Sequence, residues 1–223
     1  MSNNFQSSIL IFKKDIMSEL RTRYVVNSLL MFVLVTISII RFALGDEKTD
    51  SEILTGLLWI SIFFSSSQGL SRTFIKEEEK ETSLAIKLST DSINVLTGKL
   101  LFNLVLTFIL NILIVILFVI ITDYRIVNFT GFLITIIIGN IGLVSASTII
   151  AAIISKANTK GTLFPVLSFP ILLPLLLTVI NSTKLASLGD STDKLYPEIL
   201  ILISYTVVVT VSSYMLFRFV WED

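Results

Sequence analysis

Residues 74–99, FIKEEEKETSLAIKLSTDSINVLTGK, form a charged segment between two stretches of the chain that are almost entirely apolar. The first half is rich in strong helix formers and contains neither Gly nor Pro, which predicts a helix over residues 75–88. Turn-forming residues follow at 89–92, and Ser92 is a candidate N-cap for a second short helix running through Val95. The segment therefore predicts a helix, a break and a second helix, held between two hydrophobic runs.

The composition indicates that the bilayer is the main solvent of this chain. Of its 223 residues, 53% are hydrophobic and only 15% are charged, which is typical of a protein that crosses a membrane several times. Because the hydrocarbon core is roughly 30 Å thick, each helical crossing needs about 20 apolar residues. We therefore expect a single all-α transmembrane domain over residues 1–223, built on six apolar runs without charge in their interiors. The runs are approximately residues 25–44, 53–74, 100–122, 129–154, 162–183 and 198–219.

The distribution of Lys and Arg predicts that both termini and the charged segment face the cytoplasm. With the N-terminus inside, twelve of the 17 basic residues lie on the cytoplasmic side, in agreement with the positive-inside rule. The net charge is zero and the basic residues are spread among the loops, so we expect no nucleic-acid partner. The basic residues on the opposite side are Arg41, Lys48, Arg125, Lys184 and Lys194.

Residues 5–23, before the first run, show the spacing of an amphipathic helix. Five apolar residues recur at intervals of three or four and share one helical face, with Lys13 and Glu19 elsewhere. This pattern predicts either a helix lying in the cytoplasmic membrane interface or a helix packed on the cytoplasmic ends of the chain's own spans. The apolar residues are Phe5, Ile9, Phe12, Ile16 and Leu20.

The residue types that are missing exclude several kinds of site. The chain has neither His nor Cys, so it supplies no His or thiolate ligand to a metal or to haem, and we expect it to bind no cofactor by itself. Within the six runs the only acidic residue is Glu198 at an edge, whereas ion-coupled carriers usually keep a carboxylate in the membrane. An intramembrane enzyme is also disfavoured, because the Ser and Thr residues of the runs have no base to activate them.

The sequence also lacks a common nucleotide-binding motif. A phosphate-binding loop of the form G-x-x-x-x-G-K-[ST] is missing, since the pair Gly98–Lys99 is followed by Leu100 and position 93 is Ile. If ATP drives this protein, we expect that another subunit binds it.

Two runs carry residues that modify a helix. Gly139 and Gly142 lie in the fourth run among other small residues, a pattern typical of close helix packing, with a substrate-facing groove as the alternative. Pro165, Pro170 and Pro174 lie in the fifth run, where each removes a backbone donor. We expect this helix to be kinked or broken at mid-depth, either for packing or to line a pathway.

The order of these features resembles an ABC-2-type permease, and the local motifs are similar to those of the B subunit of the haem exporter in cytochrome c maturation. The similarity extends over essentially the whole chain. Two positions depart from the pattern common in that family, which has a small residue where Thr82 stands and a proline near Asp91. The motifs are GLLW at 56–59, SS at 65–66, LSRTF at 70–74, the acidic run leading into TSL at 82–84, GK at 98–99, FPILLP at 169–174 and FVWED at 219–223.

The resemblance implies that residues 75–97 form a cytoplasmic coupling-helix hairpin that docks on an ATPase subunit. Carboxylates would steer the docking by pairing with basic residues of the ATPase, and apolar side chains would fill a groove on it. The candidates are Glu78, Glu79 and Glu81 for the pairing, and Leu84 and Leu88 for the groove.

The resemblance also implies further partners and a bacterial inner-membrane location. A second permease copy or another membrane subunit would complete the transmembrane unit, beside a membrane protein that handles haem and a periplasmic haem chaperone. Two roles stay open: carrying haem across the membrane, or transmitting ATP-driven motion so that the loaded chaperone is released. A permease of the same architecture that exports another amphiphile or lipid is the alternative function.

Overall fold

The computed structural model describes residues 2–45, 49–79, 82–156, 163–190 and 192–222, and the regular structure in these ranges is entirely α-helical. Six of the helices, namely α2, α3 and α6 to α9, are long and apolar enough to cross a membrane. The prediction of an all-α membrane protein with six spans is therefore confirmed. The described helices are α1 (Ser2–Thr22), α2 (Tyr24–Leu44), α3 (Ser51–Leu70), α4 (Ile75–Glu79), α5 (Ser83–Ser89), α6 (Ser92–Thr122), α7 (Phe129–Ser155), α8 (Leu163–Leu188) and α9 (Thr192–Glu222).

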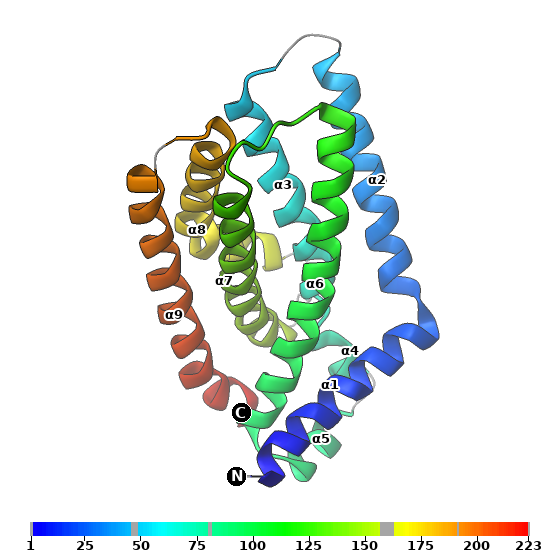
Figure 1. The fold of residues 1–223 in the computed structure, drawn as a ribbon. Coiled ribbons are helices and arrows are strands. Elements are labelled where there is room, and N and C mark those ends of the chain that lie inside the picture. Colours follow the sequence, from blue (N-terminus) through cyan, green and yellow to red (C-terminus); the bar gives the residue numbers. More distant parts are fainter. Residues whose placement is uncertain (1, 46–48, 80–81, 157–162, 191, 223) are drawn as a thin grey trace.

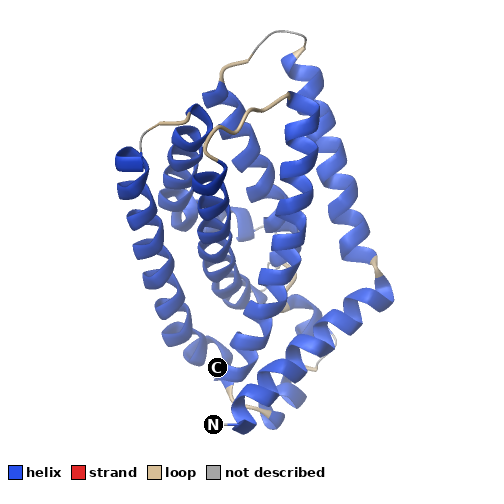
Figure 2. Cartoon of the chain, in the orientation of Figure 1, coloured by secondary structure: helices blue, strands red, loops and turns tan. Residues whose placement is uncertain are grey.

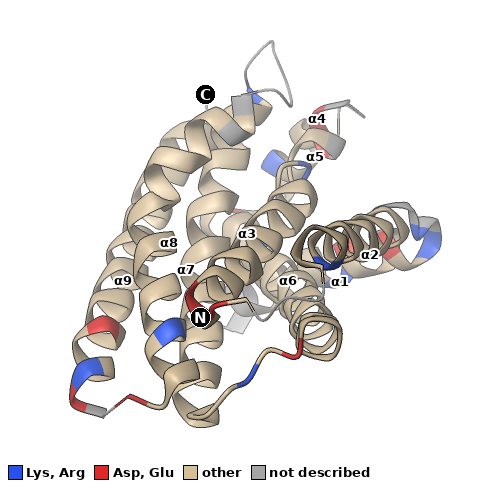
Figure 3. Cartoon of the chain, turned by 90° about the horizontal axis from the view of Figure 1, so that it is seen from above, with Lys and Arg blue, Asp and Glu red and all other residues tan. Residues whose placement is uncertain are grey.

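The spans stand side by side, and α1 lies across one end of the bundle (Figure 1). The short helices α4 and α5 and both ends of the chain lie at this same end, which we call the base (Figure 1). The loop between α6 and α7 lies at the opposite end (Figure 2). Seen from above, α3 and α7 lie in the middle of the bundle, with α2 and α9 on opposite sides (Figure 3).

The central helix α7 is surrounded closely because small residues along it let neighbouring helices approach. A Cβ atom added to Gly139 would lie 2.8 Å from both the ring of Trp59 and a methyl group of Val179. One added to Gly142 would lie 2.9 Å from Thr206 Oγ1. At these two glycines α7 therefore packs against α3, α8 and α9.

The N-terminal helix α1 packs on α6 through a face other than the apolar one read from the sequence. Ser8, Ile11 and Asp15 are buried at the base, whereas Ile9 and Leu20 of the apolar stripe are exposed. The helix thus rests on the chain's own base, as one of the two alternatives has it. Contact of α1 with the membrane interface, the other alternative, stays a prediction.

Three helices are longer than their apolar runs, which corrects the predicted boundaries. The helix α6 begins at Ser92, so that the short helix expected through Val95 is the start of the third span. The helix α8 continues to Leu188 and α9 begins at Thr192, so most of the loop expected over residues 184–197 is helical. An apolar run marks only the part of a helix that lies in lipid, whereas the backbone stays helical until a breaker intervenes.

The charged segment also differs from the prediction. It contains two short helices, Ile75–Glu79 and Ser83–Ser89, where a single helix was expected over residues 75–88. The backbone N–H of Thr82 donates to the carbonyl oxygen of Glu77 at 2.9 Å, five residues back along the chain, so the regular four-residue pattern ends here. The break after α5 falls at Thr90, whose backbone is extended, in the turn predicted at 89–92.

The helix α8 is unbroken between Leu163 and Leu188, although Pro170 and Pro174 lie inside it. Of the kink or break expected in the fifth span, the break is therefore wrong, and the kink stays a prediction. Neighbouring groups supply hydrogen bonds near the prolines, as is common within membrane helices. The hydroxyl of Tyr205 on α9 donates to the carbonyl oxygen of Ile171 at 2.7 Å, and that of Thr178 donates to the carbonyl oxygen of Pro174. Pro165 lies in the first turn of α8, where a missing backbone donor costs little.

Candidate functional site

The first acidic residue of the charged segment, Glu77 on α4, points into the protein and is only 6% exposed. Its Oε1 atom accepts hydrogen bonds from the ammonium groups of two lysines. The distance to Lys14 Nζ on α1 is 2.8 Å, and the other donor is Lys99 Nζ on α6. One carboxylate oxygen thus joins three helices of the base.

Asp15 completes this group of charges. Its Oδ1 atom lies 3.1 Å from Lys14 Nζ, and its Oδ2 atom lies 3.1 Å from Lys99 Nζ. Two ammonium groups therefore face two carboxylates, and the charges balance. We call these four residues, Lys14, Asp15, Glu77 and Lys99, the charged junction.

Within the charged junction, Lys99 is the most deeply buried member, with 3% of its surface exposed. Its ammonium group also donates to the carbonyl oxygen of Thr73 at 2.9 Å and lies 5.5 Å from the centre of the Phe74 ring. A buried ammonium group is tolerated only when it is paired and hydrogen-bonded in this way. Lys99 therefore contacts α1, α4 and the connection from α3 to α4 at once.

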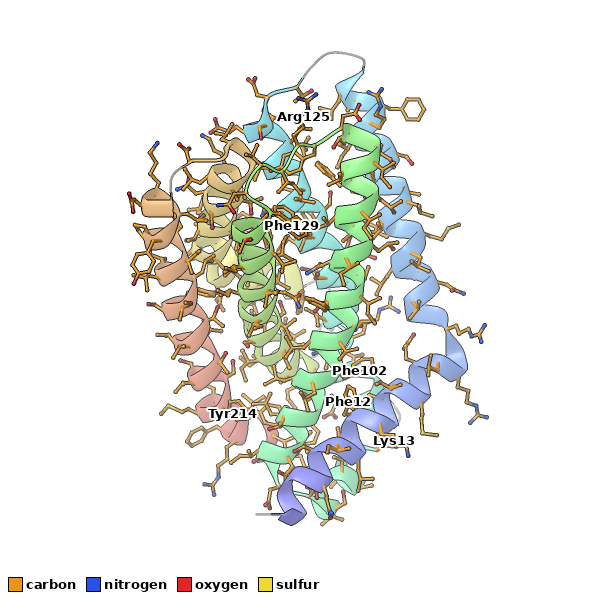
Figure 4. All side chains as sticks on the ribbon, viewed as in Figure 1. Phe12, Lys13, Phe102, Arg125, Phe129 and Tyr214 are labelled. Atoms are coloured by element: carbon orange, nitrogen blue, oxygen red, sulfur yellow. The ribbon has the colours of Figure 1, made fainter. Side chains whose placement is uncertain are left out.

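The neighbouring Gly98 explains how α1 comes close enough to join the charged junction. A Cβ atom added here would lie 2.7 Å from the Cβ atom of Ile11 and 2.7 Å from the backbone oxygen of Ser8. No other residue type fits without displacing the backbone of α1. In Figure 4, Phe12 and Phe102 mark the crossing of α1 and α6.

Two charges of the junction, those of Glu77 and Lys14, are stable near neutral pH. Burial alone would raise the pKa of Glu77, but Lys99 and Lys14 outweigh it and hold this pKa below the ordinary value of 4.5. Burial alone would lower the pKa of Lys14, but Asp15 and Glu77 together raise it above the ordinary value of 10.5. Both groups are therefore ionised across the physiological range.

A cluster of aromatic rings lies beside the charged junction. The rings of Phe217 and Trp221 at the end of α9 are stacked, with centroids 5.6 Å apart, and both lie within 6 Å of the Phe74 ring. The ammonium group of Lys87 on α5 lies 5.9 Å from the centre of the Trp221 ring. The C-terminal end of α9 thus contacts both the start of the charged segment and α5.

The described residues among those predicted to meet an ATPase lie at the base but differ in their surroundings. Glu78 lies 3.8 Å from Lys156 Nζ at the end of α7 and accepts a hydrogen bond from Ser83, so its carboxylate is engaged within the chain. Glu79 is the last residue of α4, and Glu81 lies outside the described residues. Leu84 and Leu88 on α5 are 67% and 88% exposed.

A stripe of buried polar residues on α6 was missed by the sequence reasoning. Lys99, Asn103, Thr107 and Asn111 follow one another at intervals of four and face the interior. The side-chain amide of Asn103 donates to Thr148 on α7 at 2.8 Å, and that of Asn111 donates to Asn140 on α7 at 2.9 Å. The four-residue spacing of polar residues in an apolar run was the available signal.

The sequence matches the model of a family described as CcmB protein, over residues 6–217. The chain belongs to the CcmB family. CcmB proteins are the permease subunit of the haem exporter, an ABC transporter of cytochrome c maturation, so this chain is a multi-pass membrane subunit of that kind. No curated protein matches the sequence.

In this CcmB chain, three of the short motifs that suggested the family meet at the base. The LSRTF motif contributes Phe74, the GK motif contributes Gly98 and Lys99, and the FVWED motif contributes Trp221. Their contacts give each motif a structural role around the charged segment.

Proposed function

We propose that this permease subunit couples ATP hydrolysis by a partner ATPase to haem delivery, or to release of the haem-loaded periplasmic chaperone, in the bacterial inner membrane. The observation that supports this most directly is the form of the charged segment. It is a pair of short helices at the base, exposed on one side at Leu84 and Leu88 and joined on the other side to α1, α6 and α9. A segment of this kind is suited to pass an external push into the spans.

In this proposal the base faces the cytoplasm. The reason is the positive-inside rule, since twelve of the 17 Lys and Arg residues belong to the segments on the same side of the membrane as the N-terminus. Docking would use the exposed apolar residues Leu84 and Leu88 together with the carboxylates of Glu78, Glu79 and Glu81. Because Glu78 already faces Lys156, a basic residue of the ATPase would compete with that internal pair or extend it.

The part played by this chain in haem handling is mechanical in our proposal. With no His and no Cys it offers neither an imidazole nor a thiolate to haem iron, and in our proposal a membrane partner holds the haem. A second permease copy or a different membrane subunit would stand beside the six spans.

The test of docking is a co-purification experiment on the full complex in detergent. Exchange of Glu78, Glu79 and Glu81 for Lys is expected to reduce the amount of ATPase recovered with the permease, because like charges then meet at the interface. The same three residues exchanged for Gln give the matched control, which removes the attraction without adding repulsion and has a smaller effect. Unchanged ATPase binding together with unchanged cytochrome c assembly in the Lys variant would show that the segment does not couple.

The test of orientation uses the absence of native cysteine. A Leu88→Cys variant is expected to react in intact cells only after the inner membrane is permeabilised, when a membrane-impermeant maleimide is the probe. An Asp193→Cys variant, at an exposed position where α9 begins, serves as the control and reacts from the periplasm. The opposite pattern would place the charged segment on the wrong side for an ATPase.

A further inference from the structure

Gly98 and Lys99 are neighbours on α6 that make two different attachments. Gly98 lets the backbone of α1 pack directly on α6, with Ile11 and Ser8 at the closest points. Lys99 adds ion pairs to Asp15 on α1 and to Glu77 on α4. Two helices that are far apart in the sequence, α1 and α4, are thereby fixed to the same turn of α6.

The attachment of α4 depends on a buried carboxylate, since Glu77 pairs with Lys99 and Lys14 through the same oxygen, Oε1. Its second oxygen, Oε2, is buried and has no hydrogen-bond partner among the described residues. Moving α4 away from Lys99 would leave the buried carboxylate of Glu77 without one of its two ammonium partners. Such a separation raises the free energy of the protein. The connection before α4 is held by the same ammonium group, through the carbonyl oxygen of Thr73.

The helix that carries Lys99 continues without interruption into the membrane. It runs from Ser92 to Thr122 as one element, with the charged junction near its start. A displacement of the junction therefore moves the start of a span directly, with no flexible loop between them.

We propose that Lys99 is a positioning residue that holds α1, α4 and the first turns of α6 as one mechanical unit, through which movement of the charged segment enters the membrane. This inference rests on the proposed coupling function and names its internal route. Docking on the ATPase uses the outer surface of α4 and α5, whereas transmission uses the buried junction. The two steps are therefore separable by mutation.

The first test is the double variant Glu77→Gln/Lys99→Met, studied in the complete complex. Each new side chain is close in size to the original, and Lys14 and Asp15 still pair with each other, so no unpaired charge is buried. We expect the ATPase to co-purify and to hydrolyse ATP as before, while the yield of c-type cytochromes falls by roughly five-fold or more. Lys99→Arg, which keeps the cation, is expected to retain cytochrome assembly.

The matched control is Glu52→Gln/Lys184→Met. It removes a pair of 2.8 Å that joins α3 and α8 away from the base, and we expect no effect on cytochrome yield. A normal yield in the junction variant would overturn the inference, and so would loss of the ATPase together with the yield, because the junction would then only shape the docking surface. If the wild-type protein brings down no ATPase, the proposed function itself fails.

The second test leaves the charged junction intact. It tests whether α1 and α6 move as one unit even if the double variant Glu77→Gln/Lys99→Met does not accumulate. Ser8 Oγ and Asn94 Oδ1, on α1 and α6, lie 3.5 Å apart, so Ser8→Cys/Asn94→Cys is the pair chosen to cross-link the two helices, with disulfide formation confirmed by loss of free thiol. If α1 and α6 move as one unit, oxidation of the solubilised complex leaves its ATPase activity unchanged relative to the two single variants. Inhibition by the disulfide, reversed by a reductant, would show that the helices must separate and would overturn the inference.

Discussion

The side-chain amide of Asn111 on α6 donates a hydrogen bond to the side-chain oxygen of Asn140 on α7, at 2.9 Å and in the interior of the bundle. Together with the bond from Asn103 to Thr148, this bond fixes how α6 and α7 stand along and around one another. Such bonds in membrane proteins are worth about 0.6 to 1.7 kcal/mol.

We predict that Asn111→Leu and Asn140→Leu are each destabilising and that the double variant is more stable than their separate effects suggest. Each single change leaves one amide buried without its partner, whereas the double change removes both. Thermal unfolding in detergent for the four proteins gives the coupling, with about 1 kcal/mol expected. Strictly additive effects would mean that the bond contributes nothing to helix pairing.

Gly98→Ala is predicted to displace α1. The added methyl group would overlap Ile11 and the backbone of Ser8, and overpacking of this kind costs about 1 to 3 kcal/mol. Limited proteolysis should show α1 cleaved faster than in the wild type. Gly56→Ala is the control, since beyond its own stretch of helix no atom of the described residues lies within 4 Å of the new Cβ position. Equal protection of α1 in both variants would contradict the close contact.

Glu77 is predicted to make the base sensitive to acid. Its pKa in the folded protein is below the ordinary value of 4.5, so its stabilising contribution is present above that value and is lost as the pH falls through the lowered folded pKa. Lys14 contributes at the other end of the pH scale. Its pKa in the folded protein is above the ordinary value of 10.5, so its stabilising contribution is present below that value and is lost as the pH rises through the raised folded pKa. The wild type should therefore be more stable than Glu77→Gln near neutral pH, and the gap should narrow on acidification.

The measurement is the unfolding temperature of the wild type and of Glu77→Gln in detergent, from neutral pH down to acidic pH. Glu52→Gln, at a mostly exposed carboxylate, controls for a general loss of charge and should stay near the wild type throughout. A gap between wild type and Glu77→Gln that stays constant down to the lowest pH would contradict the assignment of the effect to ionised Glu77.

Trp221→Ala is predicted to destabilise the protein by about 3 kcal/mol and to loosen α5. The change removes the ring contacts with Phe74 and Phe217 and the surface under Lys87. Trp221→Phe should be nearly neutral, because a ring is kept and the indole N–H has no hydrogen-bond partner among the described residues. Unfolding temperatures distinguish the two, and equal losses would mean that ring stacking is not the source of the stability.

The sequence was sufficient for the spans because each depends on local composition. Twenty apolar residues in succession leave few structures other than a membrane helix, and each of the six runs falls largely within such a helix. The second run was predicted to reach Phe74, whereas α3 ends at Leu70. The ends of the helices were predicted less well. The N-terminal extension of α6 and the start of α9 at Thr192 are polar, and hydrophobicity carries no information about them.

The charged junction was beyond sequence reasoning because its members are distant along the chain. Glu77 was one of a run of acidic residues, and nothing local indicated that it would turn inward. Lys99 stood at the start of an apolar run, where a lysine whose charge reaches the membrane surface is the usual expectation. The crossing of α1 over α6 brings Asp15 to Lys99, which is also paired with Glu77.

The charged junction also bears on how the protein is made. Asp15 and Lys14 leave the ribosome well before Glu77, and Lys99 follows with the third span, so the early charges stay hydrated until that span has been inserted. The four residues of the charged junction can therefore pair only after the first three spans have been inserted with the correct topology. Formation of these ion pairs would mark the completion of the first half of the permease during its synthesis.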